Sequence, residues 1–104
     1  MKLLTKAILK KFEQVGGQDS NDNPLIIAKF FNPSGAGTWY AIEYHPKEEV
    51  FFGYVSIFGD HNDEWGLFSL AELEEVRTRF GLKIERDLHF GYQRFNDVVK
   101  KEDK

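Results

Sequence analysis

The chain has no cysteine among its 104 residues, so disulfide bonds, thiolate catalysis and zinc sites with cysteine ligands are excluded. It has no apolar run long enough for a signal peptide near its start, or for a membrane span of roughly 20 residues. The formal net charge of -3 gives neither the basic excess of a nucleic-acid binder nor the charge of a nucleic-acid mimic. We therefore expect a cytoplasmic protein that does not bind membranes, and the charge does not favour a nucleic-acid partner.

Sequence patterns that carry catalysis or metal binding are missing as well. The glycines of Gly35–Gly37 precede a predicted strand rather than a helix, so they form no phosphate-binding loop. The acidic segment Asp60–Glu64 lacks calcium-loop spacing, and a polar hairpin turn explains it better than a divalent metal site. His45, His61 and His89 lie beside no nucleophile in the sequence, which favours surface or edge positions over general-base roles. The sequence predicts no catalytic residues, no metal and no other cofactor.

A first helix is predicted from a cap and from apolar spacing. Thr5 is a candidate N-cap, because its side chain can accept a hydrogen bond from a free backbone N–H of the first turn. Apolar residues recur at helical spacing from Thr5 to about Gln14, and Gly16 and Gly17 end the helix.

A second helix is predicted from Leu70 to about Phe80. Ser69 followed by Glu72 has the spacing of a capping box, and Gly81 is the expected C-terminal cap. The residues expected on its buried face are Leu70, Leu73, Val76 and Phe80.

Apolar and aromatic segments separated by short turns predict strands at residues 25–32, 38–45, 50–58 and 64–68. A further strand within residues 82–90 is interrupted by the charged triplet Glu85–Asp87. Turns this short make neighbouring strands antiparallel. The expected fold is α+β, an antiparallel meander of three to five strands packed with two short helices. We expect residues 1–95 to form this single domain and residues 96–104 to form a charged tail that frays, although Val98 and Val99 could dock a last turn.

Aromatic residues make up 15% of the chain and supply the candidate binding residues. Strand alternation groups Trp39 with Glu43 and His45, and a purely buried face would not carry the last two. Either helices cover both apolar faces of the sheet, or one face stays partly open and binds a partner. The candidate binding residues are Trp39, Glu43, His45, Phe51, Tyr54 and Trp65.

Trp39 is the expected centre of this surface. We expect it to be partly exposed, to lie near Tyr54 or Phe51, and to contribute a large share of the binding energy. If Trp39 is instead a core residue, the binding face should be sought around Trp65 and the turn at residues 60–64.

Two charged groups have structural interpretations. Lys2, Lys6, Lys10 and Lys11 give the first helix a basic side, which a solvated face explains more simply than nucleic-acid binding. The triplet Glu85–Asp87 lies in an apolar context, which favours a structural ion pair over a polar binding site.

Five short segments together resemble the bacterial domain-of-unknown-function family 2958. They span nearly the whole chain, and they are Leu3–Lys6, Thr38–Tyr40, Phe51–Gly53, Gly66–Glu74 and Gly81–Phe90. The resemblance implies a small protein carried on plasmids, phages or integrative elements, and it carries over no catalytic residue. The Gly- and Asn-rich loop from Gly16 to Asn23 departs from the family pattern.

We therefore predict a non-catalytic interaction protein that binds a protein partner through an aromatic sheet face. The implied setting on mobile elements suggests anti-defence or regulatory work, which is an analogy rather than a physical argument. Self-association through the same face is a further option. The alternatives are a small hydrolase that gathers histidines and carboxylates from loops, and a weak binder of single-stranded nucleic acid.

Overall fold

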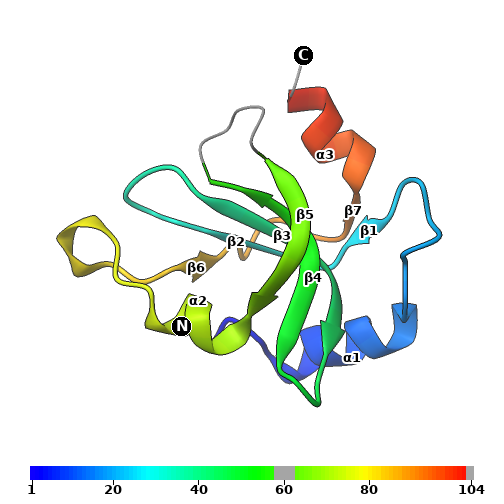
Figure 1. Cartoon of the computed structure of the whole chain (residues 1–104), viewed down its shortest axis with the longest axis horizontal. Coiled ribbons are helices and arrows are strands. Elements are labelled where there is room, and N and C mark those ends of the chain that lie inside the picture. Colours follow the sequence, from blue (N-terminus) through cyan, green and yellow to red (C-terminus); the bar gives the residue numbers. More distant parts are fainter. Residues whose placement is uncertain (58–62, 103–104) are drawn as a thin grey trace.

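The computed structural model describes residues 1–57 and 63–102 of the chain, with side chains through Val99 outside the gap. Its main feature is a five-stranded antiparallel sheet in the order β5-β4-β3-β2-β6, accompanied by a two-stranded sheet and three helices (Figure 1). The predicted α+β fold is therefore confirmed. The elements are α1 Lys6–Val15, β1 Leu25–Ile26, β2 Ala28–Phe31, β3 Thr38–His45, β4 Val50–Ser56, β5 Glu64–Ser69, α2 Leu70–Glu75, the 3-10 turn η1 Arg79–Gly81, β6 Glu85–Arg86, β7 Gln93–Arg94 and α3 Phe95–Glu102.

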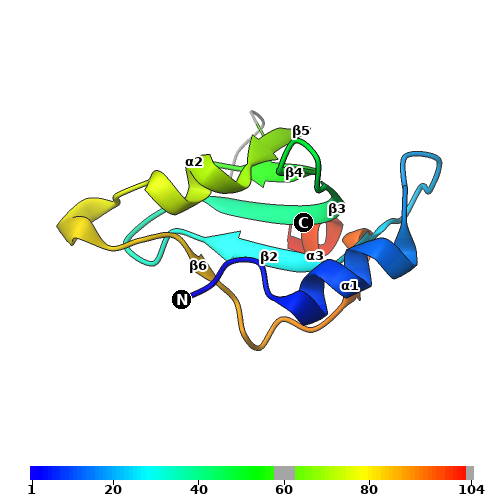
Figure 2. The ribbon, with the colours of Figure 1, turned by 90° about the horizontal axis from the view of Figure 1, so that it is seen from below.

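Each face of the sheet has its own apolar core. One face, here the α1 face, packs against α1 and α2, and the opposite α3 face packs against α3 (Figure 2). The α1 face holds the larger cluster: Leu3, Ile8, Phe12, Ile27, Ala28, Phe30, Ala41, Phe51, Phe68, Leu73 and Ile84. The α3 face holds Ile26, Tyr40, Ile42, Phe95, Val98 and Val99. Helices thus cover part of both faces.

The first helix forms as its sequence signals predict. Thr5 Oγ1 accepts a hydrogen bond from the backbone N–H of Ile8 at 3.2 Å, which is the expected N-cap geometry. Gly16 ends the helix with φ 70°, a left-handed value that glycine adopts at little cost. Ile8 and Phe12 are the buried residues of this helix.

The second helix is shorter than predicted. It begins at Leu70 but ends at Glu75, so the expectation of helix through Phe80 with Gly81 as its cap is wrong. The guanidinium of Arg77 donates to the carbonyl oxygens of the residues that end the helix, which satisfies groups that a longer helix would have used. Thr78 then donates to the carbonyl of Leu82, so the chain reverses through the short 3-10 turn η1 and does not continue α2.

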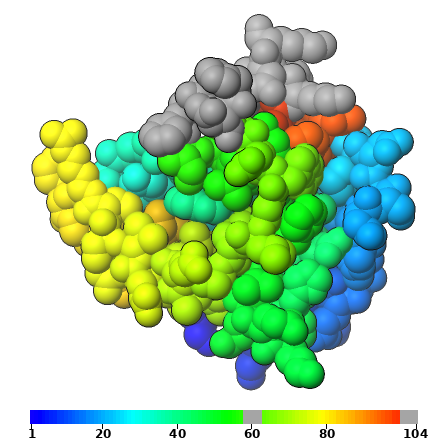
Figure 3. All heavy atoms as spheres, in the orientation of Figure 1, coloured from blue at the N-terminus to red at the C-terminus, as the bar shows by residue number. Residues whose placement is uncertain are grey.

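This early ending overturns part of the predicted buried face. Leu73 is buried, but Val76 and Phe80 are 37% and 83% exposed. Phe80 has φ 66°, which is costly for a residue with a side chain. The segment of residues 76–82 projects from the body of the molecule, at the left of Figure 3.

Two expectations for the C-terminal part are also corrected. The strand β6 lies on the charged triplet itself, where Arg86 pairs with Phe30 and Glu85 with Phe31, so the triplet does not interrupt a strand. The segment from Asn96 is helical through Glu102 as part of α3, and Val98 and Val99 are buried against the sheet, which agrees with the expected docking of these two valines but not with fraying from Asn96. Residues 103 and 104 lie outside the described residues.

Ser69→Ala should lower the free energy of unfolding by about 1 kcal/mol, the usual cost of losing an N-cap. The physical reason is the hydrogen bond that Ser69 Oγ accepts from the N–H of Glu72 at 2.9 Å. Glu72→Ala should cost less, since that side chain is exposed. Urea melts measure both variants, and an unchanged midpoint for Ser69→Ala would contradict the capping role.

Candidate functional site

A β-bulge in β3 changes which residues share a face. Ala41 pairs with Gly53 and Glu43 pairs with Phe52, so Ile42 is the extra residue. Because the bulge shifts the alternation by one residue, the predicted grouping of Trp39 with Glu43 and His45 is wrong. Trp39 and Ala41 belong to the α1 face. The residue of β4 directly opposite Trp39 is Val55, and neither Tyr54 nor Phe51 is paired with it. Glu43 lies opposite Phe52, on the α3 side.

Gln18 stabilises this bulge from the loop after α1. Its side-chain Nε2 donates to the carbonyls of Leu25 and Ile42, at 2.8 and 2.9 Å, and its Oε1 accepts from the N–H of Leu25 at 2.7 Å. Its own N–H donates to Glu43 Oε2 at 2.7 Å. Gln18 is 5% exposed and is the one buried polar residue of the described core. The Gly- and Asn-rich loop therefore has a structural role that its sequence did not reveal.

Glu43 and His45 come together beside the C-terminal end of α1. His45 Nε2 lies 3.5 Å from Glu43 Oε1, and both residues line a hollow of about 220 Å³ that also includes Glu13 and Tyr44. The lining residues include no serine, threonine or cysteine. Burial raises the pKa of the Tyr44 hydroxyl above its ordinary value, and the carboxylates of Glu49 and Glu74 raise that pKa further. The pair lacks a ready nucleophile, and Glu43 already holds the Gln18 loop.

Two of the predicted binding residues belong to the core. Phe51 has no exposed surface and packs against Phe30, Tyr44 and Phe68, at ring-centre distances of 5.2, 4.9 and 5.5 Å. Trp39 is partly exposed, as expected, but it packs against the same cluster. A partner could therefore not reach Phe51 without disturbing the α1 core, whereas Trp39 keeps a partly exposed surface.

Trp65 and Tyr54 lie together on the α3 face. The Trp65 ring stacks on Phe52 at 5.9 Å, meets Tyr54 edge-on at 5.4 Å, and contacts Phe95 of α3 at 4.8 Å. Trp65 is nevertheless 40% exposed. Leu67, two residues along β5 and opposite Phe52, is 68% exposed. Phe52, Tyr54, Trp65 and Leu67 form an aromatic surface that α3 covers only at the Trp65 end, and it is called the β4–β5 patch below.

Phe52 and Leu67 are the residues of this patch that the sequence interpretation did not name, and Leu67 is the more exposed of the two. The signal was present, because Leu67 is two residues from Trp65 on the same predicted strand, and such residues share a face. The interpretation instead centred on the strand of Trp39, where the bulge changes the alternation.

The remaining sequence candidates show no assembled site. His61 and most of the acidic turn lie within residues 58–62, outside the described residues. His89 is exposed. Among residues 1–57 and 63–102, no group of three or more histidine, aspartate and glutamate side chains is placed to hold a metal ion.

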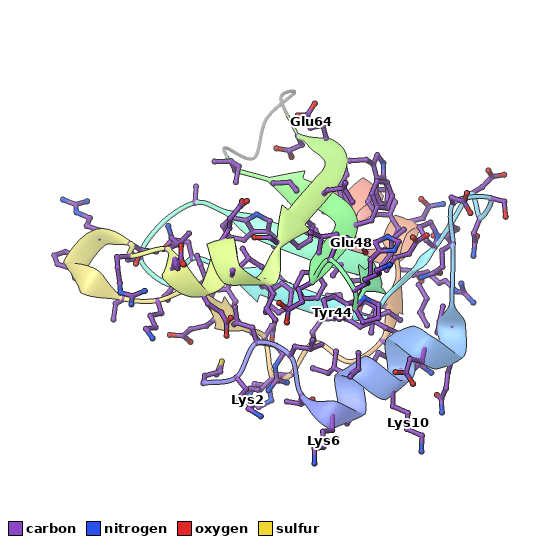
Figure 4. The ribbon with its side chains drawn as sticks, turned by 60° about the horizontal axis from the view of Figure 1, so that its bottom comes forward. Lys2, Lys6, Lys10, Tyr44, Glu48 and Glu64 are labelled. Carbon is purple, nitrogen blue, oxygen red and sulfur yellow. The ribbon has the colours of Figure 1, made fainter. Side chains whose placement is uncertain are left out.

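The lysines of the first helix are mainly exposed to solvent, and the charged triplet Glu85–Asp87 makes structural contacts. Lys2, Lys6 and Lys10 are exposed and project from the N-terminal segment and α1 (Figure 4). Lys11 instead lies over the Tyr92 ring, 4.7 Å from its centre. The charged triplet fixes β6, since Asp87 pairs with Lys29 on β2 at 3.8 Å and Arg86 Nε donates to the carbonyl of Lys2 at 3.2 Å. The triplet thus attaches to β2 and the N-terminal segment.

Trp39→Ala should destabilise the fold instead of leaving it intact. Truncating a large aromatic side chain in a core costs about 3–5 kcal/mol, and because Trp39 is partly exposed its loss should cost less, about 2–3 kcal/mol. Urea melts followed by near-UV circular dichroism measure the change. A variant with an unchanged melt would return Trp39 to the candidate binding residues.

No helix in the described part of the chain is both long and apolar enough to cross a membrane.

Comparison with known proteins identifies a family. Residues 2–98 match the family described as "Protein of unknown function (DUF2958)", which includes every segment that carried the sequence resemblance. No curated protein and no solved structure matches the chain. Since the match covers nearly the whole sequence, the chain belongs to the DUF2958 family.

Proposed function

We propose that this protein is a non-catalytic interaction module that binds a protein partner through the β4–β5 patch. The observation that carries the proposal is the exposure of two apolar side chains on the α3 face of β5, Leu67 at 68% and Trp65 at 40%, beside the partly exposed Phe52 and Tyr54. Contiguous exposed apolar surface is uncommon on soluble monomers and tends to mark an interface. Tryptophan is also enriched among residues that dominate binding energy, because it gives a large contact area with one polar group.

The chemistry of the described residues supports binding over hydrolysis. Glu43 and His45 are the carboxylate and imidazole that come together, and Glu43 already accepts the backbone N–H of Gln18 at 2.7 Å. A general base needs a nucleophile or a water-filled site within hydrogen-bond reach of a substrate. Among the described residues that line the hollow beside the pair, the one side-chain hydroxyl group belongs to Tyr44. Its pKa is raised, which makes it a weaker nucleophile at neutral pH.

The biological setting of this proposal comes from the family resemblance alone. A small protein carried on a mobile element would act in the bacterial cytoplasm, where it would bind a host or element-encoded protein. Countering host defence and regulating the element are the two roles that suit such a binder, and this is an argument by analogy.

The test compares partner binding by variants of the patch. A partner isolated from the native host should bind Leu67→Ser and Trp65→Ala at least about thirtyfold more weakly than the original chain, a loss of about 2 kcal/mol. Leu88→Ser is the matched control, because Leu88 is an exposed leucine of similar exposure, 60%, away from the patch. Isothermal titration calorimetry measures the affinities. Equal affinity of the original chain, Leu67→Ser and Trp65→Ala would refute the proposed surface.

A further inference from the structure

The strand β5 is an edge strand whose outer side is unpaired in the described part of the chain. It ends the five-stranded sheet, and its strand partner is β4. Its six residues contain no proline and no lysine, and its register with β4 runs without a bulge. Proteins commonly use proline, lysine or a β-bulge to protect an edge strand, because an unprotected edge can pair with another chain. The edge of β5 is therefore available for strand addition.

The hydrogen-bond pattern shows which backbone groups face outward. The N–H of Leu70 donates to the carbonyl of Glu49 at 3.0 Å, and these two residues are directly opposite in the register of β4 and β5. Hydrogen-bonded pairs alternate along an antiparallel ladder. Glu64, Gly66 and Phe68 therefore direct their backbone groups toward β4. The N–H and C=O groups of Trp65 and Leu67 therefore point to the open side, whereas Ser69 serves as the N-cap of α2.

The same residues carry the exposed apolar side chains. Trp65 and Leu67 present their side chains on the α3 face, within the β4–β5 patch, and their backbone groups to the open edge. An added strand would form main-chain hydrogen bonds with both residues. Its alternate side chains would lie on the α3 face beside the patch. Trp65 and Leu67 thus offer both backbone hydrogen bonds and apolar side-chain contacts to an added strand.

The charge around β5 indicates the kind of strand that fits. Residues 63–75 include Asp63, Glu64, Glu72, Glu74 and Glu75 and no cation. Of the acidic residues near the two ends of β5, Glu64 and Glu72 are exposed, and exposed Glu49 lies beside the start of α2. A second copy of this acidic edge would bring like charges together, whereas lysine or arginine would find opposite charges.

We propose that the β5 edge binds an extended segment of a protein partner, in which apolar residues alternate and lysine or arginine residues flank them. This proposal rests on the proposed function, since it names the binding mode of the same surface. The segment adds as a sixth strand beside β5, with hydrogen bonds to the backbone of Trp65 and Leu67. Its apolar side chains pack beside those two residues, and its cations pair with the carboxylates near the ends of β5.

A random peptide library displayed on phage and selected on the full chain tests this proposal. The selected peptides should show apolar residues at alternate positions and lysine or arginine at their flanks. Their affinities are then measured for the original chain, Leu67→Ala and Leu67→Pro. Both variants lose the leucine side chain, but only Leu67→Pro also loses an outward N–H, and the hydrogen bonds of β5 to β4 are kept.

Leu67→Pro should bind the selected peptides at least about tenfold more weakly than Leu67→Ala, the cost of a lost hydrogen bond plus the clash of the ring. The selected peptides can also be methylated on the backbone nitrogens of either the odd or the even residues. Only one of these two sets of N–H groups faces β5 in an added strand, so only one methylation pattern should weaken binding to the original chain. Equal binding by Leu67→Pro and Leu67→Ala, with neither methylation pattern mattering, would overturn strand addition and leave the patch as the interface.

Other outcomes would also overturn the proposal. Selected peptides that bind Leu67→Ala and Trp65→Ala as well as the original chain would refute the patch itself, and with it the proposed function. Peptides with helical spacing or acidic flanks, or a library that yields no binder, would overturn the proposed occupant. A dimer seen by sedimentation in the original chain and absent in Leu67→Pro would show that the edge binds a second copy, which also overturns it.

Discussion

Gly53→Ala is expected to destabilise the fold by about 3 kcal/mol or more, the upper range for overpacking a tight site. A Cβ atom at Gly53 would lie 1.9 Å from the carbonyl oxygen of Tyr40 and 3.0 Å from the Cα of Ala41. These are backbone atoms at the start of the β3 bulge, so no side-chain rotation can make room. The strand would have to shift, with loss of pairing between β3 and β4. Urea melts and amide hydrogen exchange across β3 measure the effect.

Gly66→Ala is the matched control for this experiment. Gly66 is opposite Gly53 in the register of β4 and β5, yet a Cβ atom there would meet nothing within 4 Å. Removing the conformational freedom of a glycine in the unfolded chain should leave the stability unchanged or raise it by roughly 0.5 kcal/mol. Similar losses in both variants would contradict steric conflict at Gly53 as the cause.

The parts of the fold that were predictable depend on interactions close in sequence. Thr5 and Ser69 each accept a hydrogen bond from an N–H three residues later, so their caps are visible as spacing. The boundaries of β3 at Thr38 and His45 follow from an aromatic-rich run between turns. The order of the central strands follows because short turns leave antiparallel neighbours as the simple solution.

Most of the errors came from interactions distant in sequence, although local contacts of Arg77 and Thr78 also contribute to the early end of α2. The end of α2 depends on Thr78, which bonds both Leu82 and, through Ser34, the loop before β3. The strand β6 forms because β2 offers it an edge, and the α3 helix is held by burial of Val98 and Val99. Neither a helical pattern nor a charge pattern contains this information, since tertiary packing overrides local propensity.

The candidate site was predictable in kind but not in place. Aromatic excess and incomplete cover indicated an open sheet face, and Trp65 was named among its residues. The bulge at Ile42 then exchanged the faces of the residues that follow it, so Glu43 and His45 were assigned to the wrong surface. One extra residue in β3 was sufficient to cause this error, because side chains along a strand alternate between the two faces of the sheet.

The interaction that fixes this irregularity gives the last expected result. Gln18→Met keeps the size of the side chain but should lower the free energy of unfolding by about 3 kcal/mol, because each buried group left without a partner costs roughly 1–3 kcal/mol. The groups that lose their hydrogen bonds are the N–H and C=O of Leu25 and the C=O of Ile42.

Gln14→Met provides the control, since Gln14 is an exposed glutamine on α1 and its replacement should change stability by less than about 0.5 kcal/mol. Amide exchange locates the effect of Gln18→Met, which should speed exchange at Leu25 before the rest of the sheet, because its N–H bonds to the Gln18 side chain. If Gln18→Met melts like the original chain, the loop is not what stabilises the bulge. The bulge, and with it the side of the sheet on which Glu43 and His45 lie, would then depend on the close approach of Gly53 to Tyr40 alone.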